Sequence, residues 1–157
     1  MLRTASWVLL GLVATLVLFG SLASAWLAYV GDPSTDVFGE GGPSVQDVSG
    51  WRADVGPAVR ARRGTAAAYA SGFALLFLVI ALVPYRRGDV WAWWALLGGA
   101  LLVALLTWLR VPLLGTRLGA GAGAGLLGAT GLGLLLDAGR LRGPRPDKGT
   151  ISAPVVS

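Results

Sequence analysis

The sequence contains no cysteine and no histidine. The absence of both residues excludes disulfides, thiol nucleophiles, histidine ligation of haem, most zinc sites and imidazole acid–base catalysis. In addition, no Asp, Glu, Lys or Arg lies in the middle of any long apolar run. Ionisable groups within a span are the usual mark of proton relays and ion paths, so their absence argues against a pump, a proton-coupled transporter or an intramembrane protease.

Charged residues are scarce in the chain as a whole. Of its 157 residues, 13% are charged and 55% are hydrophobic, whereas about 25% of the residues in an ordinary soluble domain are charged. A bilayer accommodates that much apolar surface, and a soluble core of this size does not. The net charge of +5 is typical of membrane topology and lipid attraction. We therefore predict an integral membrane protein whose partner is the lipid bilayer and not a nucleic acid.

Four apolar segments are long enough to cross the hydrocarbon core, which takes about 20 residues of helix. They predict an all-α, integral membrane four-helix bundle over 1–139, with helices at about 6–30, 65–84, 90–109 and 118–136. One longer polar loop, 31–63, separates the first two helices. The remaining segment, 140–157, is basic and contains Gly and Pro, so we expect it to be disordered.

The first apolar segment also has an alternative interpretation as a cleaved signal peptide. Arg3 would form the basic region, and Ala23-Ser24-Ala25 would form the small-residue cleavage site. The apolar run continues past that site to Val30, which favours an uncleaved span.

The polar loop contains one segment with a helix signal. Ser44 is followed three residues later by Asp47, which indicates a capped first turn. Val45, Val48 and Trp51 would then share one face, so we predict a short surface helix, with an irregular loop as the alternative. The acidic residues of the loop lack the alternating spacing of an EF-hand, and we predict no metal site.

The stretch PYRRGDVWAWW, residues 84–94, separates the second and third apolar segments. Pro84 either ends the second helix or lies in its last turn, and Gly88 suits a left-handed turn. Indole rings prefer the headgroup level, and arginines there either set the topology or bind lipid phosphate. The interfacial or lipid-contact candidates are Arg86, Arg87, Trp91, Trp93 and Trp94.

This turn and the segments before it resemble a family of small, uncharacterised four-helix bacterial integral membrane proteins. The likeness rests on Gly31-Asp32-Pro33 after the first helix, a polar loop with a central Trp, and the sequence PYRRGDVWAWWAL. In that family the turn often reads YRRGE-aromatic-W, and Asp89 stands here where Glu is expected. The likeness covers roughly 31–97 and implies a fold and a bacterial inner membrane, but no activity and no functional residues.

The fourth apolar segment is rich in glycine. Gly119 and Gly123, like Gly121 and Gly125, match the G-x-x-x-G spacing that lets two helix backbones approach closely. Two interpretations remain open: a face for a second copy of the chain, or tight packing of this helix against its own bundle. The segment lacks the Gly-Lys-Ser/Thr ending of a phosphate-binding loop.

The polar side chains within the spans are hydroxyls. We expect each to bond back to its own helix, as such groups usually do; they include Thr15, Ser21, Ser71, Thr107 and Thr130. Because no base accompanies them, we predict no catalytic residue, no cofactor and no enzymatic activity.

The function that this composition favours is a structural or accessory role through helix–helix contacts, as a homo-oligomer or as a subunit of a larger membrane complex. The alternative is a binder of lipid or another hydrophobic small molecule between the helices. Its pocket would be lined by Phe73, Phe77, Trp94 and Trp108. A membrane enzyme or transporter is least favoured, because it needs a polar cavity at mid-depth.

The orientation follows from the N-terminus more than from the count of basic residues. With the N-terminus inside, seven of the 13 Lys and Arg residues lie inside and six outside, which decides little. The signal-like start, with Arg3 before the apolar run, inserts with its basic end inside. We therefore predict that both termini and the Arg86–Arg87 hairpin are cytoplasmic.

Overall fold

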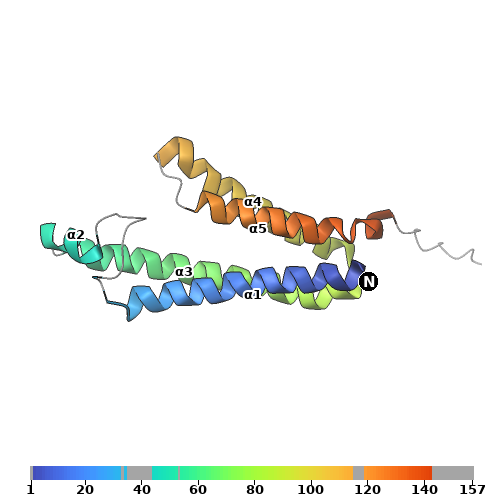
Figure 1. The fold of residues 1–157 in the computed structure, drawn as a ribbon, viewed down its shortest axis with the longest axis horizontal. Helices are drawn as coiled ribbons and strands as arrows, with labels where there is room; N and C mark the ends of the chain where they lie inside the picture. Colours follow the sequence, from blue (N-terminus) through green and yellow to red (C-terminus); the bar gives the residue numbers. More distant parts are fainter. Residues whose placement is uncertain (1, 33, 35–43, 53, 115–118, 143–157) are drawn as a thin grey trace, which may run out of the picture.

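A computed structural model of the chain describes residues 2–32, 34, 44–52, 54–114 and 119–142. Every regular element among these residues is a helix, and the elements follow the order α1, α2, α3, η1, α4, α5, η2 (Figure 1). Three helical stretches are long and apolar enough to cross a membrane, namely Arg3–Tyr29, Val55–Tyr85 and Val90–Leu113. The all-helical prediction is confirmed.

Helices α1 (Leu2–Tyr29) and α3 (Val55–Ile80) form a long antiparallel pair. The predicted start at 65 marks the apolar part of the second long helix, whereas α3 itself begins at Val55, close to the alternative start at Pro57 that the sequence allows. The hydropathy pattern marks where a helix becomes apolar and not where it begins. The polar first turns of α3 are helical because they pack against α1 and α2.

The short helix predicted in the polar loop is confirmed as α2 (Val45–Trp51). Its first turn is closed by a reciprocal capping box, because Asp47 N donates to Ser44 Oγ at 3.1 Å and Ser44 N donates to Asp47 Oδ2 at 2.8 Å. Val45 is buried, and a Cβ added at Gly56 would lie 3.7 Å from its Cγ1, so α2 rests on the start of α3. The side chains of Val48 and Trp51 lie outside the described residues.

Pro84 does not end the second long helix, although it lies close to its last turn. The helix widens into a π-helical turn, η1 (Ala81–Tyr85), which contains Pro84. A proline lacks an N–H and its ring collides with the carbonyl four residues earlier, and a wider turn accommodates both. Gly88 follows with φ +112°, as predicted, and Asp89 N donates to Pro84 O at 3.1 Å to close the turn.

Helices α4 (Val90–Leu114) and α5 (Ala120–Leu135) form the second antiparallel pair, followed by the 3₁₀-helix η2 (Ala138–Arg142). The predicted end at 109 is wrong, since α4 continues through Pro112. The predicted start of the last helix at 118, and most of the tail, lie outside the described residues. With 16 residues, α5 is about 24 Å long, which is less than the roughly 30 Å of bilayer hydrocarbon.

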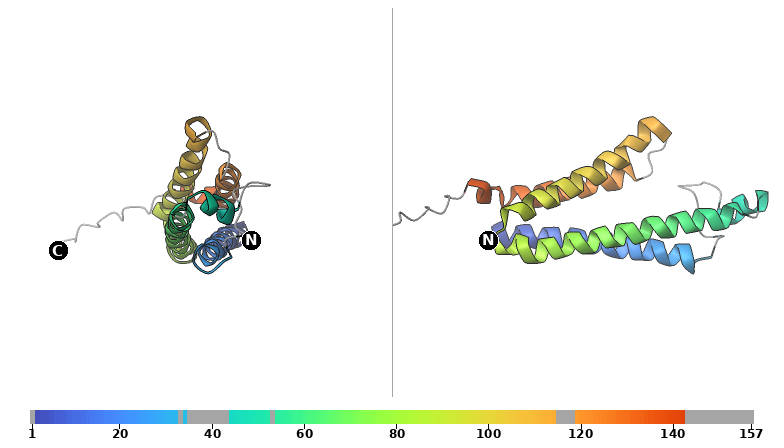
Figure 2. Two further views of the ribbon diagram at one scale, coloured as in Figure 1. Left: turned by 90° about the vertical axis from the view of Figure 1, so that its left-hand side faces the viewer. Right: turned by 180° about the vertical axis from the view of Figure 1, so that it is seen from behind.

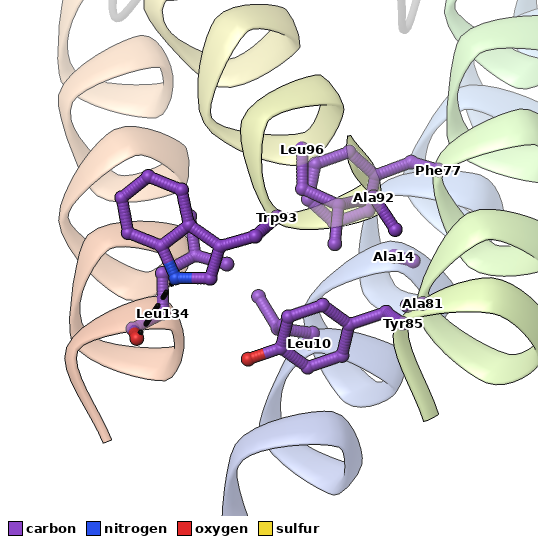
Figure 3. Close-up of a cluster of buried hydrophobic side chains, with 9 residues drawn as sticks. All are labelled: Leu10, Ala14, Phe77, Ala81, Tyr85, Ala92, Trp93, Leu96 and Leu134. Carbon is purple, nitrogen blue, oxygen red and sulfur yellow. Dashed lines mark hydrogen bonds between the residues drawn. The ribbon is translucent and has the colours of Figure 1, made fainter. Parts of the chain in front are cut away.

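The two helix pairs converge at the end that holds the start of α1 and diverge toward the end of α4 and the start of α5 (Figures 1 and 2). Helix α5 packs on α1, whereas α3 and α4 meet at few positions although they are consecutive. The buried core lies at the converging end and takes residues from all four long helices (Figure 3). It comprises Leu10, Ala14, Phe77, Ala81, Tyr85, Ala92, Trp93, Leu96 and Leu134.

Candidate functional site

A small set of buried hydrogen bonds joins the two helix pairs at the converging end. Ser6 Oγ donates to the carbonyl of Gly133 at 2.6 Å, and it lies 2.5 Å from the hydroxyl of Tyr85. Because a serine has one hydroxyl hydrogen, Tyr85 is the donor to Ser6. The indole N–H of Trp93 donates to Leu134 O at 3.2 Å (Figure 3). Three helices and the π-turn are therefore joined by polar groups inside an apolar core.

Of the five mid-span hydroxyls named in the sequence analysis, four behave as predicted. Four of them bond to a carbonyl of their own helix: Thr15 to Gly11, Ser21 to Leu18, Ser71 to Ala67, and Thr107 to Val103. The exception is Thr130, which is fully buried and whose Oγ1 has no hydrogen-bond partner among the described residues.

Polar side chains also link α1 to α3 away from the core. Arg60 Nε donates to Ala28 O at 2.9 Å, and its terminal nitrogen donates to Gly31 O at 3.0 Å. Ala28 lies in the last turn of α1 and Gly31 just beyond it, where carbonyls lack a partner within the helix, so Arg60 caps α1. Further along, Ser71 Oγ donates to Ser21 Oγ at 2.9 Å.

Two of the α5 glycines pack against neighbouring helices inside the protein. A Cβ added at Gly123 would overlap Thr107 Oγ1 and lie 3.4 Å from Ala104 Cα on α4. A Cβ added at Gly133 would lie 2.9 Å from Leu10 Cδ2 on α1. Both glycines therefore allow α5 to approach a neighbouring helix, as the own-bundle interpretation predicts for Gly123.

The other α5 glycines have open surroundings. Gly121, Gly125 and Gly128 are exposed, and a Cβ added at any of them would meet no atom within 4 Å. The exposed Leu132 continues the same spacing along the helix. Gly119 precedes the helix with φ +84°, a conformation that favours glycine. The G-x-x-x-G residues are thus divided between the interior and an outward face formed by Gly121, Gly125, Gly128 and Leu132.

Two apolar grooves run beside this face, between α4 and α5. One, of about 700 Å³, is lined by residues that include Trp108, Leu109 and Gly121. The other, of about 440 Å³, is lined by residues that include Leu101, Ala124 and Gly128. Leu105, Trp108 and Ala124 border both grooves, so the two are continuous. They exist because the small residues of α5 leave volume beside the larger side chains of α4.

The pocket predicted from four aromatic residues does not assemble. Phe73 and Phe77 pack with ring centroids 5.8 Å apart, and Phe73 lies where Gly99 of α4 leaves room for it. Trp94 is exposed, and its ring centroid lies 4.7 Å from that of Trp93 in a T-shaped arrangement. Trp108 borders the α4–α5 grooves. The sequence alone could not show that these four side chains do not form one pocket, because the spacing of aromatic residues along a helix does not determine which neighbouring helix each one contacts.

The predicted interfacial residues gather at the converging end. Arg86 and Arg87 are exposed at the end of η1, and the guanidinium of Arg86 lies 5.0 Å from the ring centroid of Trp7. Arg3 donates to Arg86 O at 2.9 Å. Of the tryptophans at the entrance to α4, Trp91 and Trp94 are exposed and Trp93 is buried.

Two carboxyl groups outside the long helices have altered acidity. The pKa of Asp47 is lowered by hydrogen bonds from the Ser44 side chain and then its backbone. The pKa of Asp32 is lowered chiefly by a hydrogen bond from the backbone N–H of Ser34. In the described part of the chain, no three acidic side chains are close enough together to hold a metal ion.

Comparisons with protein-family models, with curated proteins and with solved structures found no match to this chain. The resemblance seen in the turn at 84–94 therefore stays a prediction.

Proposed function

We propose that the chain is an integral membrane four-helix bundle with a structural or accessory role, and that it works through contacts between its helices and those of a second copy. Three stretches have the length and composition of membrane spans. The shorter α5 completes the proposed bundle by packing on α1 and α4. This role needs no catalytic residue and no cofactor.

The observation that carries the proposal is the open space over Gly121, Gly125 and Gly128. In lipid, helices associate where small residues let their backbones approach. The G-x-x-x-G spacing is self-complementary, since the same face on two copies can meet about a two-fold axis. The face carries no polar side chain that would select a different partner. A second copy of the chain is therefore the occupant that we propose.

The absence of cysteine permits a clean crosslinking test. A single cysteine introduced by Leu132→Cys, at one end of the face, should form disulfide-linked dimers in membranes. Adding Gly121→Leu and Gly125→Leu should reduce the dimer by roughly tenfold, equivalent to about 1.4 kcal/mol of association. The matched controls are Gly20→Leu and Gly72→Leu, two exposed glycines on α1 and α3 with equally open surroundings. A dimer yield that is equal in both sets would contradict the proposal.

A second candidate function, the binding of a lipid or another hydrophobic molecule, is favoured by the two continuous grooves between α4 and α5. The side chains that line them are apolar, which suits an acyl chain. A photoactivatable fatty acid should label residues around Trp108, and Ala124→Phe, which fills the shared part of the grooves, should remove that labelling. Persistent labelling in this variant would exclude the grooves as the binding site.

The proposed location is the bacterial inner membrane, with both termini in the cytoplasm. The starts of α1 and η2 lie at the same end of the molecule, which supports a common side for both (Figure 1). The basic residues Arg3, Arg86 and Arg87 are at that end as well. A protease added outside sealed cells should leave this end intact.

A further inference from the structure

A groove that combines apolar and basic side chains lies at the π-turn η1 and the residues that follow it. It has a volume of about 380 Å³ and is lined by Leu82, Val83, Arg86 and Arg87. All four side chains are exposed. Each arginine follows one of the apolar residues by four positions, so it lies one turn closer to the end of the span. The groove is thus apolar toward the middle of the helix and cationic toward its end.

No described acidic side chain forms an ion pair with the two arginines of this groove. The one ion pair among the described residues joins Arg52 to Asp54, at the far end of α3. No described carboxylate oxygen lies within 4.0 Å of the guanidinium groups of Arg86 or Arg87, although the exposed Asp89 shares this end. Arg87 also makes no hydrogen bond to a described side chain. Among the described residues, these guanidinium groups therefore have no acid that would compete with an anionic ligand.

Residues of α1 hold the backbone and the side chain of Arg86. Arg3 donates to the Arg86 carbonyl at 2.9 Å, and the ring of Trp7 lies 5.0 Å from the Arg86 guanidinium carbon. A ring at that distance attracts a guanidinium and limits its rotation. Arg3 also brings a third positive charge to the same place. Positive charge is thus concentrated and partly fixed at the level where a tryptophan ring marks the membrane interface.

We propose that this groove binds an anionic phospholipid, with the phosphate on Arg86 and Arg87 and an acyl chain along Leu82 and Val83. The planar guanidinium presents two parallel N–H donors that match a phosphate. A free phosphate would use only the cationic half of the groove, whereas a phospholipid occupies both halves. The site lies on η1 and the end of α3, so it is independent of the α5 contacts proposed above.

The test measures lipid affinity with the purified full chain in uncharged maltoside micelles. Phosphatidylglycerol carrying a fluorophore on one short acyl chain is titrated, and its anisotropy reports binding. In Arg86→Gln/Arg87→Gln the affinity should fall roughly tenfold or more, because each arginine near an anionic lipid contributes about fivefold. Arg62→Gln/Arg110→Gln removes the same charge from two exposed arginines at the other end, and it should leave the affinity within about twofold of the unmodified protein.

Competition identifies the occupant. Unlabelled phosphatidylglycerol should displace the probe, whereas phosphatidylcholine and a large excess of inorganic phosphate should not. Displacement by inorganic phosphate as effective as that by phosphatidylglycerol would overturn the proposal in favour of a small-anion site. An equal loss of affinity in both double variants would overturn it in favour of a general effect of net charge. Arg87→Gln alone leaves the Arg86–Trp7 contact intact, so its expected loss of about fivefold tests the site without disturbing α1.

Discussion

Helices α1 and α3 are joined by polar side chains along their length, whereas α4 and α5 are joined by the close approach of small residues and by one hydrogen bond, from Trp93 to Leu134 O. In the first pair, Arg60 caps the end of α1 and Ser71 donates to Ser21. In the second pair, Gly123 lies against Ala104 and Thr107, and the Thr107 hydroxyl is bonded to its own helix. These are two recognised ways of pairing helices in lipid, where apolar contact alone gives little preference for protein over lipid.

The two kinds of helix contact differ in the pockets and grooves that remain at the surface of each pair. The α1–α3 pair has a pocket of about 490 Å³ at its α2 end, which is bordered by Arg60. Glycine fills no volume beyond its backbone, so the α4–α5 pair retains apolar grooves of about 700 and 440 Å³. The first pair is therefore better suited to support the fold, and the second to present a surface.

The largest expected effect comes from breaking the close approach of α4 and α5. Gly123→Leu would force a side chain into Thr107 and Ala104, so it should destabilise the monomer by about 3 kcal/mol or prevent folding. Unfolding in mixed detergent–SDS micelles, followed by circular dichroism, measures this. The matched variant Gly121→Leu has open space and should unfold like the original protein. Equal stability of the two variants would show that α5 does not pack as described.

Removing the hydroxyl of Ser6 should lower the stability of the protein, whereas removing that of Thr130 should not. Ser6→Ala removes the group that links Tyr85 to the Gly133 carbonyl, and should cost about 1 kcal/mol in the same unfolding measurement. Thr130→Val replaces an unpartnered buried hydroxyl with a methyl group of similar size, and should be neutral or stabilising by up to about 1 kcal/mol. If Thr130→Val were the more damaging of the two, the assignment of the linking group would be wrong.

A smaller and local effect is expected in the α1–α3 pair. Arg60→Gln loses the donors that cap the Ala28 and Gly31 carbonyls, which should cost about 1 kcal/mol and fray the last turn of α1. Hydrogen exchange should accelerate over that turn and stay unchanged in α4 and α5. Arg62→Gln, an exposed neighbour on the same helix, serves as the control. Faster exchange across the whole protein would mean that Arg60 supports more than the α1 terminus.

The smallest expected effect is the pH response of α2. The folded-state pKa of Asp47 is lowered by its hydrogen bonds from Ser44, so the stabilisation is present above the unfolded value of about 3.9 and is lost as the pH falls through the folded value. Amide exchange in α2 should be constant from neutral pH down to about pH 4, after correction for the intrinsic rate, and should rise below it. Ser44→Ala should remove this dependence. A transition nearer neutral pH would contradict the assignment to Asp47.

The apolar segments and the capped turn at Ser44 could be predicted because each is a local pattern. Their boundaries could not, since contacts distant in the sequence decide them. The first turns of α3 are polar and helical because Arg60 reaches α1 and Gly64 lies against Tyr29, where an added Cβ would be 2.6 Å from the ring. Likewise, Pro84 remains within the helix because a π-turn accommodates it.

The glycine pattern of the last helix predicted close packing but not which glycines are used. Gly121 and Gly123 are the same residue type in the same repeat. They differ only in that Gly123 packs against α4 and Gly121 does not. The bond between Ser6 and Tyr85 was equally inaccessible, because 79 positions separate the two residues and neither belongs to a recognisable motif. The arginine–apolar groove could be suspected from the i and i+4 spacing, but only the folded chain shows that no described acid pairs with its arginines.

The short length of α5 has a consequence for the membrane itself. A bilayer thick enough to match α1, with 28 residues, exceeds the reach of α5, with 16. In the proposed membrane bundle, lipids next to α5 would then have to shorten or tilt, at a cost of a fraction of a kcal/mol for each ångström of difference. Two copies that met along α5 would share one such compressed patch in place of two. The elasticity of the bilayer would thus favour their encounter, and would draw the protein toward thinner regions of the membrane.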